Sequence, residues 1–148
     1  MKIMENNLFF AWVESEIAAG KHVKFLLKGN SMFPLLRSGK DKVILTKSSC
    51  EELEPMDVVL FRYRGGYLLH RIILVNGENL LLQGDGSFVA KEQCTKADVV
   101  GKLIQVCRPS GKIVSVENWK WRLPSRLWRC SDTLRKLMLR LAVFMRRG

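Results

Sequence analysis

The chain has 148 residues and carries 25 Lys and Arg against 14 Asp and Glu, a formal net charge of +11. Its apolar fraction of 47% is enough for one globular domain with a buried core, and it excludes a disordered or fibrous chain. The longest apolar run, 8–13, has six residues. A membrane-spanning helix needs about 20, so no transmembrane helix is predicted.

The N-terminal residues do not resemble a secretory signal. Glu5 lies among the first residues, and the short apolar stretch that follows leads into Glu14 and Glu16. A secretory signal starts with a basic region and continues into a longer apolar one. We therefore expect a cytoplasmic protein.

The cysteines do not form a metal or redox motif. They lie far apart, and none has a neighbouring histidine. Zinc sites and thiol redox sites both need close pairs of ligands. We expect reduced structural thiols, as is usual in the cytosol, and neither a metal nor a cofactor. The cysteines are Cys50, Cys94, Cys107 and Cys130.

The first elements along the chain are one helix and a series of strands. Apolar residues between 5 and 19 recur at helical spacing, and Gly20 follows at the expected end, so we assign 1–21 to an N-terminal helix. Short β-branched and aromatic runs separated by glycine turns then predict a mainly β, antiparallel body over 22–116. The predicted strands are 22–28, 42–46, 58–63, 67–75, 79–83, 99–107 and 112–116.

The positive charge is concentrated in the tail. Residues 108–148 contain 11 basic and two acidic residues, whereas 1–107 contain 14 and 12. Pro124 and Ser125 are typical of a helix start, and apolar residues recur from Leu127 to Met145 with basic residues on the opposite face. We predict a basic amphipathic helix within 117–148. It could pack on the body or a partner protein, contact an anionic membrane peripherally, or bind nucleic acid, which we consider the least suitable partner.

Three segments place a reactive side chain beside the end of a strand. Ser31 lies in 29–34, His70 in 68–71 and Asp85 in 83–86. Acyl transfer by a serine needs a base, a partner that orients the base, and N–H donors for the oxyanion. Each residue alone has a simpler interpretation: Ser31 and Asp85 as turn residues, and His70 as a core residue.

The order of these segments resembles that of the signal-peptidase and LexA-type serine peptidases, over roughly residues 22–107. The resemblance implies an all-β peptidase domain with the serine of the Gly-x-Ser-Met-x-Pro box as the nucleophile. The blocks that carry it are Gly-Asn-Ser-Met-Phe-Pro-Leu-Leu at 29–36, Asp-Val-Val-Leu-Phe at 57–61, Leu-His-Arg-Ile at 69–72, Gln-Gly-Asp at 83–85 and Val-Val-Gly-Lys at 99–102.

The histidine in the third block indicates which branch of the family is most similar. His70 is followed by Arg71, as in the endoplasmic-reticulum type of signal peptidase, whereas the other members have a lysine base at this position. The resemblance therefore implies a Ser31–His70 catalytic unit, and imidazole can accept a proton near neutral pH. The backbone N–H of Ser31 is the matching oxyanion donor, since Gly29 offers no hydroxyl.

The sequence does not decide which acidic residue orients His70. In that branch the acid lies a few residues beyond the Gly-Asp pair, where this chain has Ala90 and Lys91. We therefore expect Asp85 to orient His70, with Asp98 as the alternative, or a Ser-His dyad if neither reaches the ring.

We expect a serine endopeptidase that holds an extended peptide along the strand edge near 26–31 and cuts after a small residue. One alternative is a catalytically decayed peptidase fold that binds peptides or docks on a membrane surface. A LexA-type regulator is disfavoured because the residues before 22 leave no room for a helix-turn-helix domain, and because His70 replaces the lysine. No oligomeric state is predicted.

Overall fold

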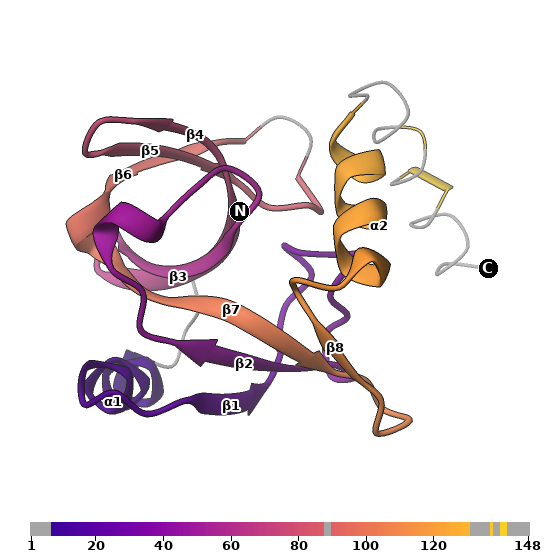
Figure 1. Ribbon diagram of the computed structural model, residues 1–148, viewed down its shortest axis with the longest axis horizontal. Coiled ribbons are helices and arrows are strands. Elements are labelled where there is room, and N and C mark those ends of the chain that lie inside the picture. Colours follow the sequence, from indigo (N-terminus) through magenta and orange to yellow (C-terminus); the bar gives the residue numbers. More distant parts are fainter. Residues whose placement is uncertain (1–6, 88–89, 131–136, 138–139, 142–148) are drawn as a thin grey trace.

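A computed structural model describes residues 7–87, 90–130, 137, 140 and 141. The fold is mainly β: an eight-stranded antiparallel sheet with a helix near each end of the chain (Figure 1). The predicted fold class is therefore confirmed. No helix among the described residues is both long and apolar enough to cross a membrane.

Seven of the eight strands lie where the sequence predicts them. The strand that the prediction missed is β6, whose sequence Glu-Gln-Cys-Thr lacks the apolar alternation that identifies the others. It lies next to a 3-10 turn, η2 (Lys96–Asp98); a second such turn, η1 (Cys50–Glu52), precedes β3. The strands are β1 (Val23–Leu26), β2 (Lys42–Thr46), β3 (Val58–Tyr63), β4 (Gly66–Asn76), β5 (Asn79–Gln83), β6 (Glu92–Thr95), β7 (Val99–Cys107) and β8 (Ile113–Ser115).

The sheet has the order β1-β2-β7-β3-β4-β5-β6, and β8 pairs with β7. The register shifts between Ile44 and Leu45, between Leu60 and Phe61, and between Ile72 and Leu74. Such irregularities bend a strand and increase its twist. Figure 1 shows the result: β3, β4, β5 and β6 curl around, while β1, β2 and β7 lie below them.

This curvature divides the buried residues into two cores. Helix α1 (Asn7–Ala18) covers the first core, which also includes residues of β1, β2 and β7. The second core fills the curve formed by β3, β4 and β5, and consists of Leu53, Val59, Phe61, Leu68, Ile72, Leu80 and Leu82.

Successive residues of β4 face different cores, because side chains alternate along a strand. Leu68 belongs to the second core and Leu69 to the first. His70 accordingly contacts Phe61 of the second core, with ring centroids 6.1 Å apart. Arg71 faces Trp121 of the first core. Neighbouring residues in the chain therefore have separate surroundings.

Helix α2 (Trp119–Arg129) starts earlier than the sequence predicts. The prediction placed its start at Pro124 and Ser125, but Asn118 caps the helix and its side chain accepts a hydrogen bond from the Lys120 N–H. The cap and the burial of Trp121 extend the helix toward the sheet. The predicted continuation to residue 145 falls mostly outside the described residues.

The loop between β1 and β2, which carries Ser31, is held by a buried carboxylate. Asp41 Oδ2 accepts hydrogen bonds from the Arg37 N–H (2.8 Å) and from Arg108 (2.9 Å), and Arg108 also donates to the Leu35 carbonyl. Burial alone would raise the pKa of Asp41, but the bonds from Arg37 and the charges of Arg108 and Arg37 hold this pKa below its ordinary 3.8.

We predict that Asp41→Asn lowers the free energy of unfolding at pH 7 by about 1–3 kcal/mol, since two guanidinium groups lose their charged acceptor. A lowered native pKa gives stability that is present above pH 3.8 and is lost as the pH falls through the native value. The difference between wild type and variant should therefore shrink below about pH 4. Urea unfolding across this range measures it.

The exposed Glu51→Gln is the matched control, since it removes a carboxylate from the surface of η1. Equal stability of Asp41→Asn and Glu51→Gln at pH 7 would show that the carboxylate does not hold the loop.

Candidate functional site

Ser31 lies in the turn after β1, and it is half-buried. The next residue, Met32, is buried in the first core and so fixes the turn to the body of the protein. The carbonyl of Ser31 accepts a hydrogen bond from the Gly86 N–H at 2.8 Å. This bond attaches the Ser31 turn to the turn that follows β5.

His70 lies in the middle of β4 and is fully buried. Its Nδ1 is hydrogen-bonded to Oε1 of Glu92, a fully enclosed residue at the start of β6. With Glu92 as a carboxylate, the ring proton resides on Nδ1 and leaves the Nε2 lone pair as an acceptor. Nε2 has no hydrogen-bond partner among the described residues, and neither has Glu92 Oε2. Buried polar atoms without partners are rare and typical of functional sites.

Gly84 brings the Ser31 turn and the imidazole together. A Cβ at this position would lie 2.3 Å from the Ser31 carbonyl oxygen and 3.1 Å from His70 Nε2. Any side chain here would push the two apart, so the close approach requires glycine. Within the described part of the chain, no hydrogen bond yet joins the Ser31 hydroxyl to Nε2.

The two acids that the sequence suggested for orienting His70 make other contacts. Asp85 accepts two hydrogen bonds from Arg71, at 2.9 and 2.7 Å, and both residues are fully buried. Asp98 caps η2 by accepting from the Thr95 N–H and hydroxyl. The predicted contact of Asp85, or of Asp98, with the imidazole is therefore wrong. The reason for Asp85 is strand alternation: it pairs with Arg71, on the opposite face of β4 from His70.

Glu92 is the residue that sequence reasoning missed. The resemblance implied an acid where this chain has Ala90 and Lys91, and the structure shows the next residue, Glu92, in contact with the imidazole. A strand prediction beginning at Glu92 would have found it, because Glu92 and Cys94 alternate inward with the exposed Gln93. The polar composition of the segment hides that alternation.

Helix α2 is hydrogen-bonded to the residues on both sides of Gly84. The Trp128 indole N–H donates to the Asp85 carbonyl at 2.8 Å, and Arg129 donates to the Gln83 side chain at the same distance. Trp121 lies over the Arg71 guanidinium, 5.6 Å from ring centroid to Cζ. The turn next to Nε2 is thus held by α2 on one side and by the Ser31 carbonyl on the other.

The Cys94 thiol and a metal centre are two alternatives to chemistry at Ser31. Burial, and to a smaller extent the Asp98 charge, raise the pKa of the Cys94 thiol to about 12, so it stays protonated at neutral pH. The described residues contain no cluster of His, Cys, Asp and Glu that could hold a metal ion.

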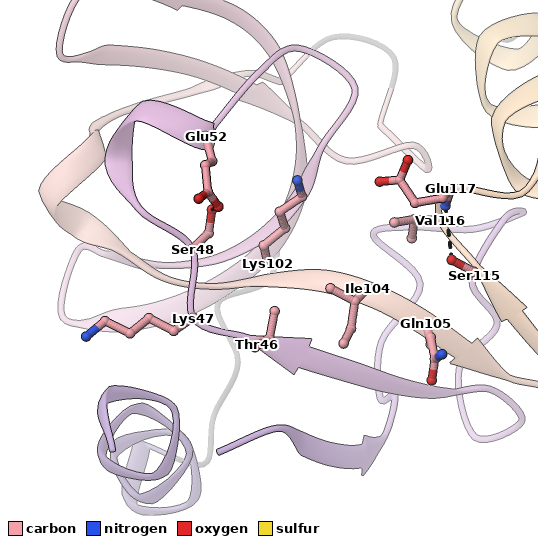
Figure 2. Close-up of a pocket in the computed structure, with 10 residues that line it drawn as sticks. All are labelled: Thr46, Lys47, Ser48, Glu52, Lys102, Ile104, Gln105, Ser115, Val116 and Glu117. Carbon is pink, nitrogen blue, oxygen red and sulfur yellow. Dashed lines mark hydrogen bonds between the residues drawn. The ribbon is translucent and has the colours of Figure 1, made fainter. Parts of the chain in front are cut away.

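A cavity of about 230 Å³ is lined by neither Ser31 nor His70. Figure 2 shows it between the end of β2, β7 and the residues after β8. Two cationic residues line it: Lys47, which is exposed, and Lys102, which is paired with Asp57 at 3.4 Å. In this lining the Ser48 hydroxyl donates to the exposed Glu52 carboxylate at 3.4 Å, and no lining residue is a histidine. We therefore place the candidate site at Ser31, His70, Gly84 and Glu92.

A search of protein-family models and of curated proteins finds no match to this chain. The resemblance of the five sequence blocks to signal-peptidase and LexA-type enzymes therefore stays a prediction. The residue roles considered below depend on the geometry of the site.

We predict that Asp85→Asn destabilises the protein by about 3–5 kcal/mol, because it leaves the Arg71 guanidinium buried without its counter-charge. Denaturant unfolding measures the loss, with the exposed Glu78→Gln as the matched control. A variant as stable as the control would mean that the pair does not hold the turn.

Proposed function

We propose that this protein is a serine endopeptidase in which Ser31 is the nucleophile, His70 the general base and Glu92 the residue that orients the imidazole. One observation carries the proposal. A buried imidazole is held at Nδ1 by a buried carboxylate, and its unpartnered Nε2 faces Gly84, against which the Ser31 backbone packs. A histidine held at Nδ1 by a carboxylate, with Nε2 left to accept a proton, is the base that serine acyl transfer needs.

In the proposed reaction, Ser31 Oγ attacks the scissile carbonyl carbon and its proton moves to His70 Nε2. The imidazolium gives that proton to the leaving amine as the C–N bond breaks, which leaves an acyl-enzyme. A water molecule, deprotonated by the same nitrogen, then releases the acid and restores Ser31. Glu92 stabilises the imidazolium and keeps the proton on Nδ1 throughout.

The first step requires the Ser31 hydroxyl to turn toward Nε2. Catalytic hydrogen bonds are often long in the free enzyme and tighten only when substrate is bound. Here the Ser31 carbonyl oxygen and His70 Nε2 both lie beside Gly84, so the proposal requires a Ser31 rotamer that points the hydroxyl toward the ring.

The Ser31 backbone N–H supplies the proposed oxyanion donor. Among the described residues this N–H makes no hydrogen bond, whereas the neighbouring Phe33 N–H donates to Asn30. A preorganised donor of this kind stabilises the charge that develops on the carbonyl oxygen. Gly29 contributes no side-chain donor to the same oxygen.

The proposed substrate is an extended peptide. Strand β1 lies at one end of the sheet order and leads directly into the Ser31 turn. A peptide that adds to this edge near 26–31 would gain main-chain hydrogen bonds and pass the nucleophile. By the resemblance to signal peptidases, the residue before the cut is small, such as Ala or Gly.

The second candidate function is a peptidase fold that binds peptides without cutting them. The observation that favours it is the lack, among the described residues, of a hydrogen bond between Ser31 and His70. Reactivity of the serine separates the two functions, because only an activated hydroxyl attacks an electrophile.

We predict that wild-type protein is labelled at Ser31 by a fluorophosphonate probe, and that Ser31→Ala and His70→Ala abolish labelling. Glu92→Gln should slow labelling by about 10²–10⁴-fold, since it loses the charge that orients and stabilises the ring. Labelling rates followed by intact mass spectrometry give the comparison.

Ser49→Ala and Asp98→Asn are the controls, and both should react at close to the wild-type rate. An unreactive wild type would favour the binding function. Wild-type labelling rates in His70→Ala would rule out the proposed base.

We also predict that the protein cleaves an extended peptide with Ala before the cut at least tenfold faster, in kcat/KM, than the same peptide with Leu there, a difference of about 1.4 kcal/mol. Mass spectrometry of the products locates the cut. Labelling without cleavage of any peptide would indicate a serine hydrolase of another substrate class.

A further inference from the structure

Helix α2 has two apolar faces. Its inner face packs on the sheet through Trp121 and Ser125, which are buried. Its outer face carries Trp119, Leu123 and Leu127, whose exposed fractions are 66%, 49% and 56%. These three residues are four apart, so they form a single stripe along the helix, which we call the outer stripe.

The outer stripe is bordered by basic residues. Lys120 lies on one side of it and Arg126 on the other, and both are exposed. Arg122 follows on the same side as Arg126 and pairs with Glu117, which precedes the helix, at 3.0 Å. Within α2 there is no acidic residue. A contiguous exposed apolar stripe bordered by charged side chains is typical of an interaction surface.

We propose that the outer stripe docks on an anionic lipid bilayer, with α2 lying in the plane of the interface. Trp119 suits the headgroup region, where an indole ring has both apolar and polar surroundings, and Leu123 and Leu127 enter the upper acyl region. Lys120 and Arg126 then face the anionic headgroups, where each basic residue adds attraction that salt screens.

The observations favour a bilayer over nucleic acid. Nucleic acid satisfies the basic residues through its phosphates, but offers the three exposed apolar side chains no apolar phase to enter. A bilayer satisfies both parts of the surface at once. The docking does not depend on the peptidase activity, since none of these residues belongs to the proposed catalytic group.

The docking would also place the candidate site near the membrane. The opposite face of α2 carries Trp128, which is bonded to the Asp85 carbonyl in the turn beside His70. Figure 1 shows α2 standing at one side of the sheet, with the segment after β5 on its inner side. The bilayer and the site would then be separated by about one helix diameter, roughly 10–12 Å.

The test is co-sedimentation of the full chain with vesicles of phosphatidylcholine alone, or of phosphatidylcholine mixed with phosphatidylserine. We expect binding to the mixed vesicles that is at least tenfold tighter than to phosphatidylcholine and that weakens as salt is added. The double variant Leu123→Gln, Leu127→Gln should lose at least tenfold in binding. In vesicles that contain brominated lipid, wild-type tryptophan fluorescence should be quenched more than that of Trp119→Phe.

The matched control is Leu74→Gln, Ile113→Gln, which removes two apolar residues of similar exposure, 53% and 57%, elsewhere on the molecule. It should bind like wild type, and thermal midpoints of both double variants should stay close to the wild-type value. The proposal is overturned if the α2 variant binds as tightly as this control, or if both vesicle types bind wild type equally. It is also overturned if duplex DNA binds more tightly than mixed vesicles and the leucine substitutions leave that binding unchanged.

Discussion

The contact between His70 and Glu92 is the constraint on which the site depends. Both side chains are fully enclosed, and they come from strands that are separated in the sheet by β5. Burying an imidazole and a carboxylate is unfavourable unless each satisfies the other. The contact is therefore possible only because β4, β5 and β6 curl around the second core and bring the two residues face to face. The remaining atoms of the pair, Nε2 and Oε2, lack partners among the described residues, and the proposed chemistry uses the first of them, Nε2, as the base.

Strand alternation separates two tasks that the sequence places side by side. His70 and Arg71 are neighbours in β4, but one faces the second core and the other the first. The residue pairs follow the same division, His70 with Glu92 and Arg71 with Asp85. In the first pair, Glu92 binds Nδ1 of His70 and leaves Nε2 as an acceptor. The second pair fixes the turn that places Gly84 beside Nε2. The Asp85 carboxylate thus fixes the turn through Arg71 and does not contact the imidazole.

Helix α2 connects this turn to the outer surface of the molecule. Its inner face supplies Trp128 to the Asp85 carbonyl and Trp121 to Arg71, and its outer face presents Trp119 with two leucines. A helix with an apolar stripe on both sides needs two partners, and the sheet is one of them. The proposed bilayer is the other. Helix α2 would then contact the turn of the candidate site with one face and present its basic residues to the bilayer with the other.

The sequence by itself determined the mainly β class, the first helix and seven strands, because apolar periodicity and glycine turns are local properties that survive without tertiary contacts. It also singled out Ser31 and His70 as the residues suited to acyl transfer, although their roles remain a proposal. Only the tertiary structure decided that β6 is a strand, that Glu92 and not Asp85 or Asp98 contacts the imidazole, and that α2 starts at Trp119. The physical reason is common to the three. A polar strand and a buried acid are stabilised by partners distant in the chain, namely β5 and His70, and the early helix start by the core around Trp121 in addition to its local Asn118 cap.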